Sequence, residues 1–303
     1  MNSDSIIIER REVPNPHLLS LLPEIYVERG TKEDWEILHE LHYKGSSLGI
    51  GPNVYRCVLE GKTIGVGVMT VPKMLLGGRN ELFAEYLKPN QNGMDTKLIN
   101  KYRAEWINDH ITVCSRLVLD TMYRGAGIAY RMQNIMMRMT GKKLIEFQSS
   151  MSKFNPFAAK AGVRFTSPRR STNYERGLAF FRRWFESIPT DFVGVMSEIN
   201  GMSEPIQIKC IAEMRKFYFN FSSLEKSGNN RMNGKSRVDE LPIGVLLKSL
   251  QQLVFASPLY GVYMNPDYDS VKDEALKLPH RLPVLAFDNQ PPDTPLDLSK
   301  LSM

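Results

Sequence analysis

A glycine-rich turn between a predicted buried strand and a predicted helix is the part of this sequence best suited to binding an anion. The turn reads Arg124-Gly125-Ala126-Gly127-Ile128-Ala129 and follows the apolar, β-branched run 111–119. The first N–H groups of a helix have no partner inside the helix, and the helix dipole adds a partial positive charge there. The glycines leave room for a pyrophosphate to touch the backbone. The turn therefore predicts a diphosphate site, although an ordinary strand-to-helix turn has the same composition.

Polar side chains close to the end of the next predicted strand, 144–149, are candidates for hydrogen bonding to a substrate. Ser149 and Asn155 are the main ones, and each is equally suited to capping the short helix predicted after them. Glu146 lies inside the strand, where it is either a general base reached through water or an edge residue that faces solvent. Arg116, in the preceding strand, contacts either an anionic substrate or a structural ion-pair partner.

The first predicted helix, 31–42, ends on a second group with acid–base capacity. His42 is a candidate general base because histidine titrates near neutral pH, and Tyr43 follows it directly. A histidine on a helix is also a common packing residue, so both roles stay open. His39 and His42 form an i,i+3 pair, but no third ligand accompanies them, and we therefore expect no metal site.

The elements that must position these residues alternate between strands and helices. A strand–turn–strand meander is expected over 53–71, and the order strand, glycine turn, helix, strand over 111–149 is a βαβ unit with parallel strands. Between them, 73–109 is polar and is expected to be an excursion with one short helix near 98–106. Together these patterns predict an α/β (α+β) domain with a mixed sheet at 24–170.

The rest of the chain is expected to flank this domain. An N-terminal arm is predicted at 1–23 and a mostly helical C-terminal extension at 171–303. The extension contains a Gly/Asn-rich linker at 227–237 and a Pro-rich tail from 279 that wraps over the surface or stays loose. Its predicted helices span 174–185, 206–224 and 243–255.

Composition and charge limit the classes of partner. Hydrophobic residues make up 42% of the 303 residues and charged residues 24%, and no run approaches the roughly 18 apolar residues of a membrane-spanning helix. The first residues lack the apolar core of a signal peptide, so a cytoplasmic protein without a membrane partner is expected. Three separated cysteines indicate reduced thiols. The net charge of +6 and a pI near 9.1 favour anionic partners such as CoA and leave nucleic acid open.

A group of arginines interleaved with aromatic residues is the second feature that suits nucleic acid. Such residues contact phosphates and stack on bases. The same spacing fits an amphipathic helix with Leu178, Phe181 and Phe185 facing a core, and this simpler interpretation is the one we favour. The group consists of Arg164, Arg169, Arg170, Arg176, Arg182 and Arg183 with Tyr174, Phe180, Phe181 and Trp184.

The order Leu117-x-Leu119, then Arg124-Gly125-x-Gly127-Ile128-Ala129, resembles the coenzyme-binding motif of the GNAT-superfamily N-acetyltransferases. Residues 115–125 and 151–162 are similar to the acetyltransferase half that occurs fused to ABC-type ATPases. His42-Tyr43-x-Gly45 gives a weaker likeness to phage Mom-type DNA-modification acyltransferases. The resemblance covers about residues 35–170, and no phosphate loop of an ATPase accompanies it.

This resemblance implies a GNAT-type sheet whose central parallel strands splay apart around acetyl-CoA or another acyl-CoA. An amine attacks the thioester directly, with no metal. Many members place an acidic tyrosine at the position of Ala158, so here the acid is missing, moved or replaced by water. The implied coenzyme contacts are Leu117, Val118, Leu119, Arg124, Gly125, Ala126, Gly127, Ile128, Ala129 and Asn155. The candidates for catalysis are Ser149, Asn155, His42, Tyr43 and Arg116.

Three functional hypotheses follow. The first is an enzyme that acylates an amine of a small molecule, protein or aminoacyl-tRNA. The second is an enzyme that modifies a DNA base, as the Mom-type likeness suggests. The third is an inactive CoA-binding interaction module, which the missing tyrosine at Ala158 keeps open and the intact turn opposes. Whether the extension recognises the acceptor or forms a homodimer also stays open.

Overall fold

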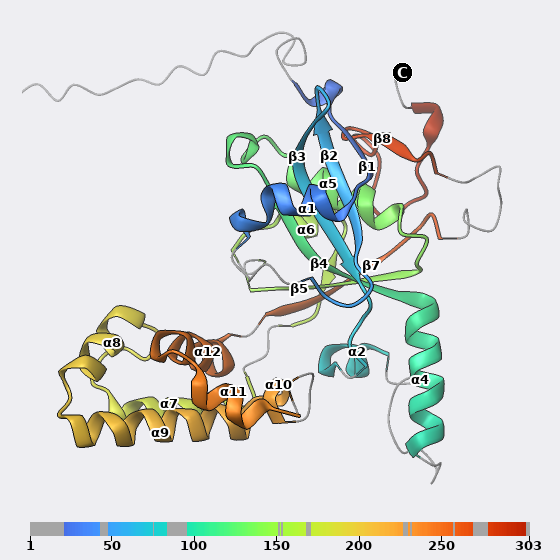
Figure 1. The fold of residues 1–303 in the computed structure, drawn as a ribbon. Coiled ribbons are helices and arrows are strands. Elements are labelled where there is room, and N and C mark those ends of the chain that lie inside the picture. Colours follow the sequence, from blue (N-terminus) through green and yellow to red (C-terminus); the bar gives the residue numbers. More distant parts are fainter. Residues whose placement is uncertain are drawn as a thin grey trace, which may run out of the picture. The chain divides into compact units, whose positions relative to one another are not determined.

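The computed structural model describes residues 21–42, 48–74, 76–83, 96–150, 152, 154–167, 171–226, 230, 232–256, 258–268 and 278–300. The chain divides into two compact units. The sheet unit comprises 1–148, 154–165 and 260–303, and the helical unit comprises 149–153 and 166–259 (Figure 1).

A mixed sheet is the framework of the sheet unit, which confirms the predicted α/β class. In the part of the chain that is described, its strand order is β6-β7-β5-β4-β3-β2-β1-β8. The pairs β1–β2, β2–β3, β3–β4, β1–β8 and β6–β7 are antiparallel, whereas β4 and β5 are parallel. The strands are β1 (Tyr26–Arg29), β2 (Asn53–Leu59), β3 (Lys62–Thr70), β4 (Ile111–Leu119), β5 (Leu144–Ser149), β6 (Arg164–Phe165), β7 (Leu259–Met264) and β8 (Arg281–Pro283).

The meander β2–β3 turns through Glu60 and Gly61, which both have positive φ, at 48° and 76°. Two residues of this conformation make the tight turn whose twist matches the flanking strands. Alternation then sends neighbouring residues of β3 to opposite faces of the sheet. Val66 and Val68 pack in a buried cluster with Trp35 of α1 (Lys32–Leu38).

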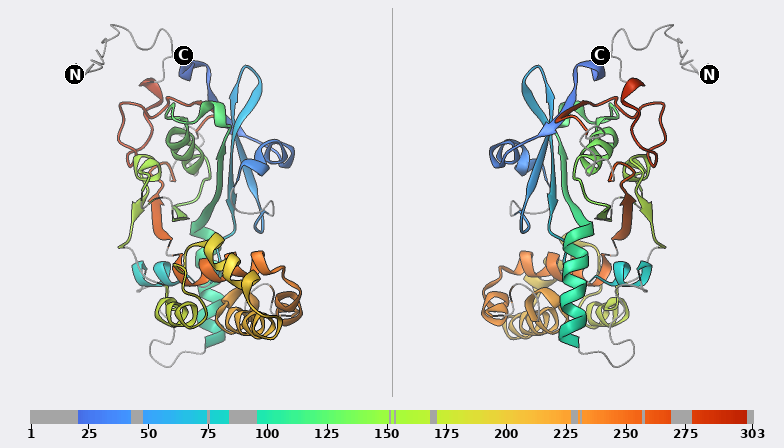
Figure 2. Two further views of the ribbon diagram at one scale, coloured as in Figure 1. Left: turned by 90° about the vertical axis from the view of Figure 1, so that its left-hand side faces the viewer. Right: turned by 90° about the vertical axis from the view of Figure 1, so that its right-hand side faces the viewer.

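Glycines on the other face of β3 let α5 (Ile128–Arg138) approach the sheet closely. A Cβ on Gly67 would lie 2.1 Å from Sδ of Met136, and one on Gly65 would lie 3.2 Å from Sδ of Met132. Figure 2 shows α1 and α5 on opposite faces of the sheet. The helix that follows the glycine-rich turn is therefore seated directly on the central strands.

The excursion between β3 and β4 is more helical than predicted. It contains α2 (Gly77–Leu82) and α4 (Thr96–His110), and α4 runs directly into β4. Ile107 near the end of α4 is buried with Ile111 and Leu144, and the rings of Trp106 and His110 stack at 5.1 Å. The helix extends past the predicted 98–106 because tertiary packing stabilises its last turn.

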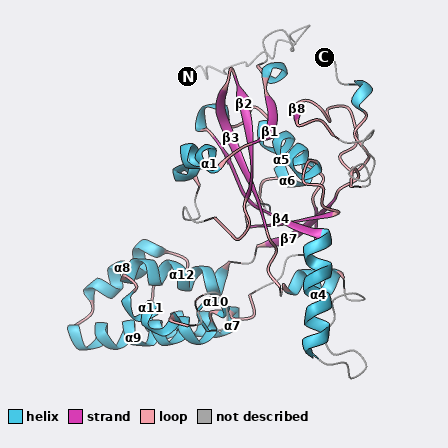
Figure 3. Cartoon of the chain, turned by 45° about the vertical axis from the view of Figure 1, so that its right-hand side comes forward, coloured by secondary structure: helices cyan, strands magenta, loops and turns pink. Residues whose placement is uncertain are grey.

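The helical unit has its own core, so its helices bury their apolar faces against one another (Figure 3). Two of these helices, α8 and α11, were not predicted. Asp191 caps α8, because its Oδ1 accepts hydrogen bonds from the amides of Val193 and Gly194 at 3.0 and 3.1 Å. The predicted linker 227–237 was wrong in part, since α11 begins inside it. The helices are α7 (Tyr174–Trp184), α8 (Phe192–Gly201), α9 (Glu204–Phe221), α10 (Ser223–Lys226), α11 (Gly234–Glu240) and α12 (Ile243–Phe255).

The last part of the chain differs from the predicted extension 171–303. Strands β7 and β8 belong to the sheet, and residues from 260 onward belong to the sheet unit. Val284, Phe287 and Leu296 of the Pro-rich tail are buried in the main core, so the alternative of a tail that stays loose was wrong. Proline content predicted irregular backbone correctly, but irregular backbone can still bury apolar side chains.

The remaining short elements are α6 (Phe157–Lys160) and 3-10 turns at Leu22–Glu24, His39–Leu41, Thr121–Tyr123 and Leu298–Lys300. The predicted N-terminal arm falls mainly outside the described residues.

Candidate active site

The parallel strands β4 and β5 are paired at one end only. Ile111–Cys114 pairs with Leu144–Phe147, and within the described residues no further pairing joins the two strands. We call this paired part the closed end. β4 continues for five residues along β3, and we call Ser115–Leu119 with the turn that follows it the open end.

A β-bulge marks the boundary between the two ends. Met69 of β3 pairs with Cys114 and Val68 pairs with Arg116, so Ser115 is an extra residue in β4. The Ser115 hydroxyl donates a hydrogen bond to the carbonyl of Val68 at 3.1 Å. A bulge bends its strand and increases the local twist. The bend falls where β4 stops pairing with β5, as expected for central strands that splay apart.

The turn at the end of β4 is organised by its own side chains. Asp120 Oδ1 accepts a hydrogen bond from the amide of Met122 at 3.0 Å, and Arg124 Nε donates to the carbonyl of Leu119 at 3.1 Å. Gly125 and Gly127 have φ of 87° and 77°, a conformation that disfavours residues with a Cβ. The two glycines are therefore required by the backbone of the turn.

The amides of this turn are available to a ligand. Among the described residues, the N–H groups of Gly125, Ala126 and Gly127 donate to no other backbone group, and those opening α5 have no partner inside the helix. Arg124, Gly125 and Ala126 are exposed, and a Cβ on Gly125 would meet no atom within 4 Å. Backbone donors gathered in one turn suit an anion such as a diphosphate.

Arg131 limits the space at the second glycine. Its Nη1 donates to the carbonyl of Gly127 at 3.1 Å and would lie 2.6 Å from a Cβ on that residue. The guanidinium is held by Asp288 of the C-terminal tail, with Nε–Oδ1 and Nη2–Oδ2 distances of 2.8 and 2.7 Å. Sequence reasoning missed this pair because its members are far apart in the chain.

The residues predicted to catalyse lie on separate elements. Arg116 is half-buried in the open end and donates to the carbonyl of Ser115 at 2.9 Å. Ser149 is buried as the last residue of β5. His42 follows the 3-10 turn His39–Leu41, which packs against β4, and its ring lies 6.0 Å from that of Trp35. Tyr43 lies outside the described residues.

Asn155 serves local structure in the way that the capping interpretation predicts. Its Oδ1 accepts a hydrogen bond from the amide of Phe157 at 3.1 Å, at the beginning of α6. The side chain is exposed.

The position of the family's tyrosine is filled by core packing. Ala158 is fully buried in the main cluster. Beside it, the ring of Phe157 packs edge-on against Phe147, the last paired residue of β5, at 5.9 Å. A side chain at position 158 therefore packs among apolar groups, and this explains why a small residue stands there.

Glu146 has neither of its two predicted roles. The side chain is 1% exposed and receives both Nε and Nη2 of Arg79 at 2.6 Å. The hydroxyl of Tyr260 in β7 donates to Oε1 of Glu146 at 2.7 Å, and burial raises the pKa of this tyrosine. Glu146 pairs in register with Val113, so this buried ion pair stands at the closed end. No local pattern in the sequence links Arg79 or Tyr260 to this position.

The part of the basic and aromatic group from Tyr174 to Trp184 forms the amphipathic helix α7, as favoured above, whereas Arg164 lies in β6. Phe181 and Phe185 are buried in the core of the helical unit, while Arg182 and Arg183 on α7 are exposed. Arg169 and Arg170 lie outside the described residues.

The described part of the chain offers neither a cluster of metal ligands nor a membrane-spanning helix. No three His, Cys, Asp or Glu side chains there come together in a way that would hold a metal ion. No helix among those residues is long and apolar enough to cross a bilayer.

Comparison with known proteins gives weak likenesses in part of the fold. No protein-family model and no curated protein matches the sequence. A GNAT-family acetyltransferase from Elizabethkingia anophelis, solved with acetyl-CoA bound, is similar over 50% of this chain and 84% of its own, with 12% identity and a TM-score of 0.28. A mutant agmatine N-acetyltransferase in its apo form is similar over 39% of this chain and 60% of its own, with 12% identity and a TM-score of 0.25. Scores this low add nothing to what the chain's own geometry indicates.

Proposed function

We propose that this protein is an acyl-CoA-dependent N-acyltransferase of the GNAT type that moves an acetyl or related acyl group to an amine. The observation that carries the proposal is the open end of β4, where a bulge, a loss of pairing with β5 and a turn of exposed amides follow one another within Ser115–Ala129.

The residues of the open end fit the two chemical parts of the coenzyme. The amides of Gly125 to Ala129 and the dipole of α5 suit its diphosphate, and Arg124 adds positive charge beside them. An unpaired strand edge offers N–H and C=O groups to an extended partner. The edge of β4 that faces away from β3 at Leu117, Val118 and Leu119 therefore suits the coenzyme's pantetheine arm, which carries amides.

When bound, the coenzyme supplies a thioester, whose acyl carbon forms a C–N bond with a neutral amine while the C–S bond breaks and the thiolate leaves. The protein's contribution is then mainly alignment and polarisation. We assign His42, whose turn packs against β4, to accepting a proton from the acceptor ammonium, with Tyr43 beside it. Arg116 and Ser149 are assigned to hydrogen bonding at the site. Because position 158 is a buried alanine, a water molecule in this proposal carries the proton that the nitrogen loses after attack to the leaving thiolate.

Calorimetric titration of the purified protein with CoA tests the site. Wild type is expected to bind. Gly127→Glu is expected to reduce the affinity at least about 100-fold, because it places a carboxylate against the diphosphate. Each of these two factors of ten corresponds to about 1.4 kcal/mol, a modest cost for two anions in contact. Gly127→Ala has the same backbone strain without the charge and is the control. Equal affinities for these two variants, or no binding by wild type, would contradict the proposal.

Incubation with acetyl-CoA and mass spectrometry of host DNA, tRNA and protein then identifies the acceptor. Modified nucleosides would select an enzyme that acts on nucleic acid, and acylated lysines or N-termini an enzyme that acts on protein. Coenzyme binding without any adduct, including on small amines, would favour the non-enzymatic CoA-binding module.

A further inference from the structure

The Arg131–Asp288 pair joins the C-terminal tail to the candidate coenzyme turn. Arg131 lies in the first turns of α5, and Asp288 lies 157 residues later, in the segment after β8. The carboxylate accepts two parallel hydrogen bonds from the guanidinium, so the pair has the bidentate geometry that fixes orientation as well as energy. The side chains are only 15% and 29% exposed, which limits screening by water.

The third nitrogen of the same guanidinium acts on the backbone of the turn. Nη1 of Arg131 donates to the carbonyl of Gly127 at 3.1 Å. The carbonyl of Gly127 and the N–H of Ile128 belong to one planar trans peptide and point in opposite directions. A hydrogen bond that holds the carbonyl toward the helix therefore holds the Ile128 N–H toward the N-terminal end of the helix, on the side of the turn.

The tail holds Asp288 firmly enough for this role. Phe287, its neighbour, is buried and packs edge-on against Tyr130 at 6.0 Å. The ring of Tyr130 also lies under the guanidinium of Arg131, with Cζ 4.7 Å from its centroid. The amide of Asp288 donates to the carbonyl of Leu285 at 2.9 Å. Backbone and side chains on both sides of the carboxylate are thus fixed.

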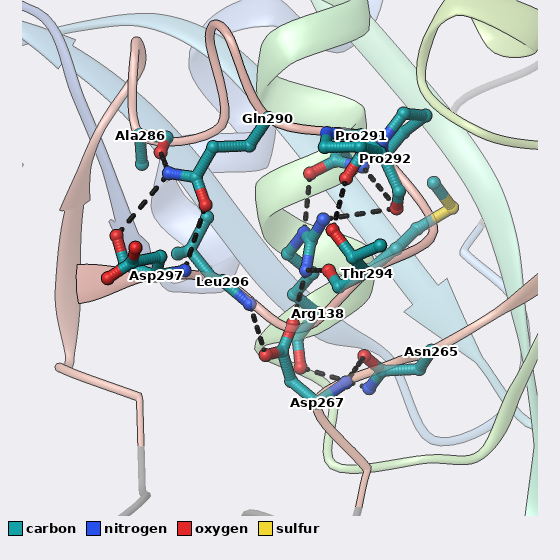
Figure 4. Close-up of polar contacts among 12 residues, drawn as sticks. Arg138, Asn265, Asp267, Ala286, Gln290, Pro291, Pro292, Thr294, Leu296 and Asp297 are labelled. Atoms are coloured by element: carbon teal, nitrogen blue, oxygen red, sulfur yellow. Dashed lines mark hydrogen bonds and ion pairs between the residues drawn. The ribbon is translucent and has the colours of Figure 1, made fainter. Parts of the chain in front are cut away.

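The C-terminal end of α5 is hydrogen-bonded to the same tail, as Figure 4 shows. Arg138, fully buried, is paired with Asp267 and donates to the carbonyls of Thr294 and Pro292 at 2.9 and 3.0 Å. The amide of Leu296 donates to the same aspartate at 2.9 Å. The tail is therefore attached to α5 at both ends of the helix, and only the first attachment touches the turn.

We infer that Asp288 is a positioning residue for coenzyme binding, which acts through Arg131 on the peptide between Gly127 and Ile128. The inference rests on the proposed function, because the group it positions is the candidate diphosphate donor. It gives the C-terminal tail a role in the site that no residue near the turn in sequence could supply.

Calorimetric titration with CoA of four single variants and one double variant tests this link. Asp288→Asn and Arg131→Gln should each weaken CoA binding about tenfold, since a factor of ten corresponds to about one charge-assisted hydrogen bond. Asp288→Glu should recover most of the affinity, because it keeps the carboxylate. Asp293→Asn is the matched control: it is in the same tail and pairs with exposed Arg164, and it should change the affinity less than about twofold.

The double variant separates positioning from general stability. If Asp288 acts through Arg131, adding Asp288→Asn to Arg131→Gln should cause no further loss of affinity. Additive losses, tighter binding by Asp288→Asn, or affinities equal to that of Asp293→Asn would overturn the inference, while CoA binding by wild type would leave the proposed coenzyme site standing. No binding by wild type would overturn both. If Asp288→Asn does not fold, the CoA affinities of Arg131→Gln, Asp288→Glu and the control Asp293→Asn are compared. The inference then requires weaker binding by Arg131→Gln than by the other two variants, and equal affinities overturn it.

Discussion

The closed and open ends of the β4–β5 pair are made from the same two strands but satisfy their polar groups differently. At the closed end four residues of each strand pair, and the buried charges of Arg79 and Glu146 neutralise each other beside them. At the open end, after the bulge at Ser115, β4 pairs with β3 alone, and the turn that follows has amides without a backbone partner. The two ends therefore differ in how their backbone groups are paired: those of the closed end are paired within the sheet, whereas the turn of the open end keeps amides without a backbone partner.

The largest effect is expected from removing the buried charge pair. Glu146→Ala leaves the guanidinium of Arg79 buried without its carboxylate, which should lower the free energy of unfolding by about 3–5 kcal/mol. Urea denaturation followed by circular dichroism measures this. Arg164→Ala, which removes an ion pair with side chains 73% and 49% exposed, is the control and should cost less than about 1 kcal/mol. Similar losses for both variants would show that the closed end is not held by this pair.

A tyrosine at the family's acid position should disturb packing. Ala158→Tyr forces a large ring into the filled core and should destabilise the protein by about 1–3 kcal/mol. Phe157→Tyr adds a hydroxyl to a half-buried neighbour and should cost less. Thermal unfolding compares the two. A stable Ala158→Tyr variant would mean that this position faces the open end after all.

Deletion of Ser115 tests whether the bulge creates the open end. The deletion leaves Cys114 opposite Met69 and Arg116 opposite Val68, so pairing with β3 can continue while the bend is lost. CoA affinity should fall at least about tenfold, or about 1.4 kcal/mol. Ser115→Ala, which loses only the hydroxyl, is the control for titration and thermal unfolding. A folded deletion variant that binds CoA normally would separate the bulge from the site.

The smallest effect concerns the boundary between the two ends. Burial raises the pKa of the Cys114 thiol to about 12, and Gln133 only partly opposes this. At pH 8 about one Cys114 thiol in 10⁴ is then ionised. A disulfide reagent should therefore label Cys114 only after unfolding. The rate of labelling should rise with pH. Rapid labelling of the native protein, located by peptide mass spectrometry, would show that the open end extends past Ser115.

The local patterns of the chain predicted the strands and the turn well. Strands β4 and β5 and helix α12 have the predicted bounds. These elements depend on short-range signals such as β-branched runs, paired glycines and helical periodicity. The glycine turn was predicted as an anion site because its donors belong to consecutive residues.

Contacts between distant residues could not be predicted in this way. Glu146 was assigned to solvent or catalysis because its partners come from α2 and β7. The tail was expected to wrap over the surface or stay loose because prolines obscure its buried apolar residues, and β7 was included in a helical extension.

By itself, the sequence determined which segments form strands and helices and where backbone donors gather, since both follow from neighbouring residue types. Only the tertiary structure decided which charges are neutralised, where the parallel strands part, and which carboxylate is joined to the glycine-rich turn through Arg131. Those outcomes depend on pairs such as Arg79 with Glu146 and Arg131 with Asp288, which are brought together by burial of the elements that carry them.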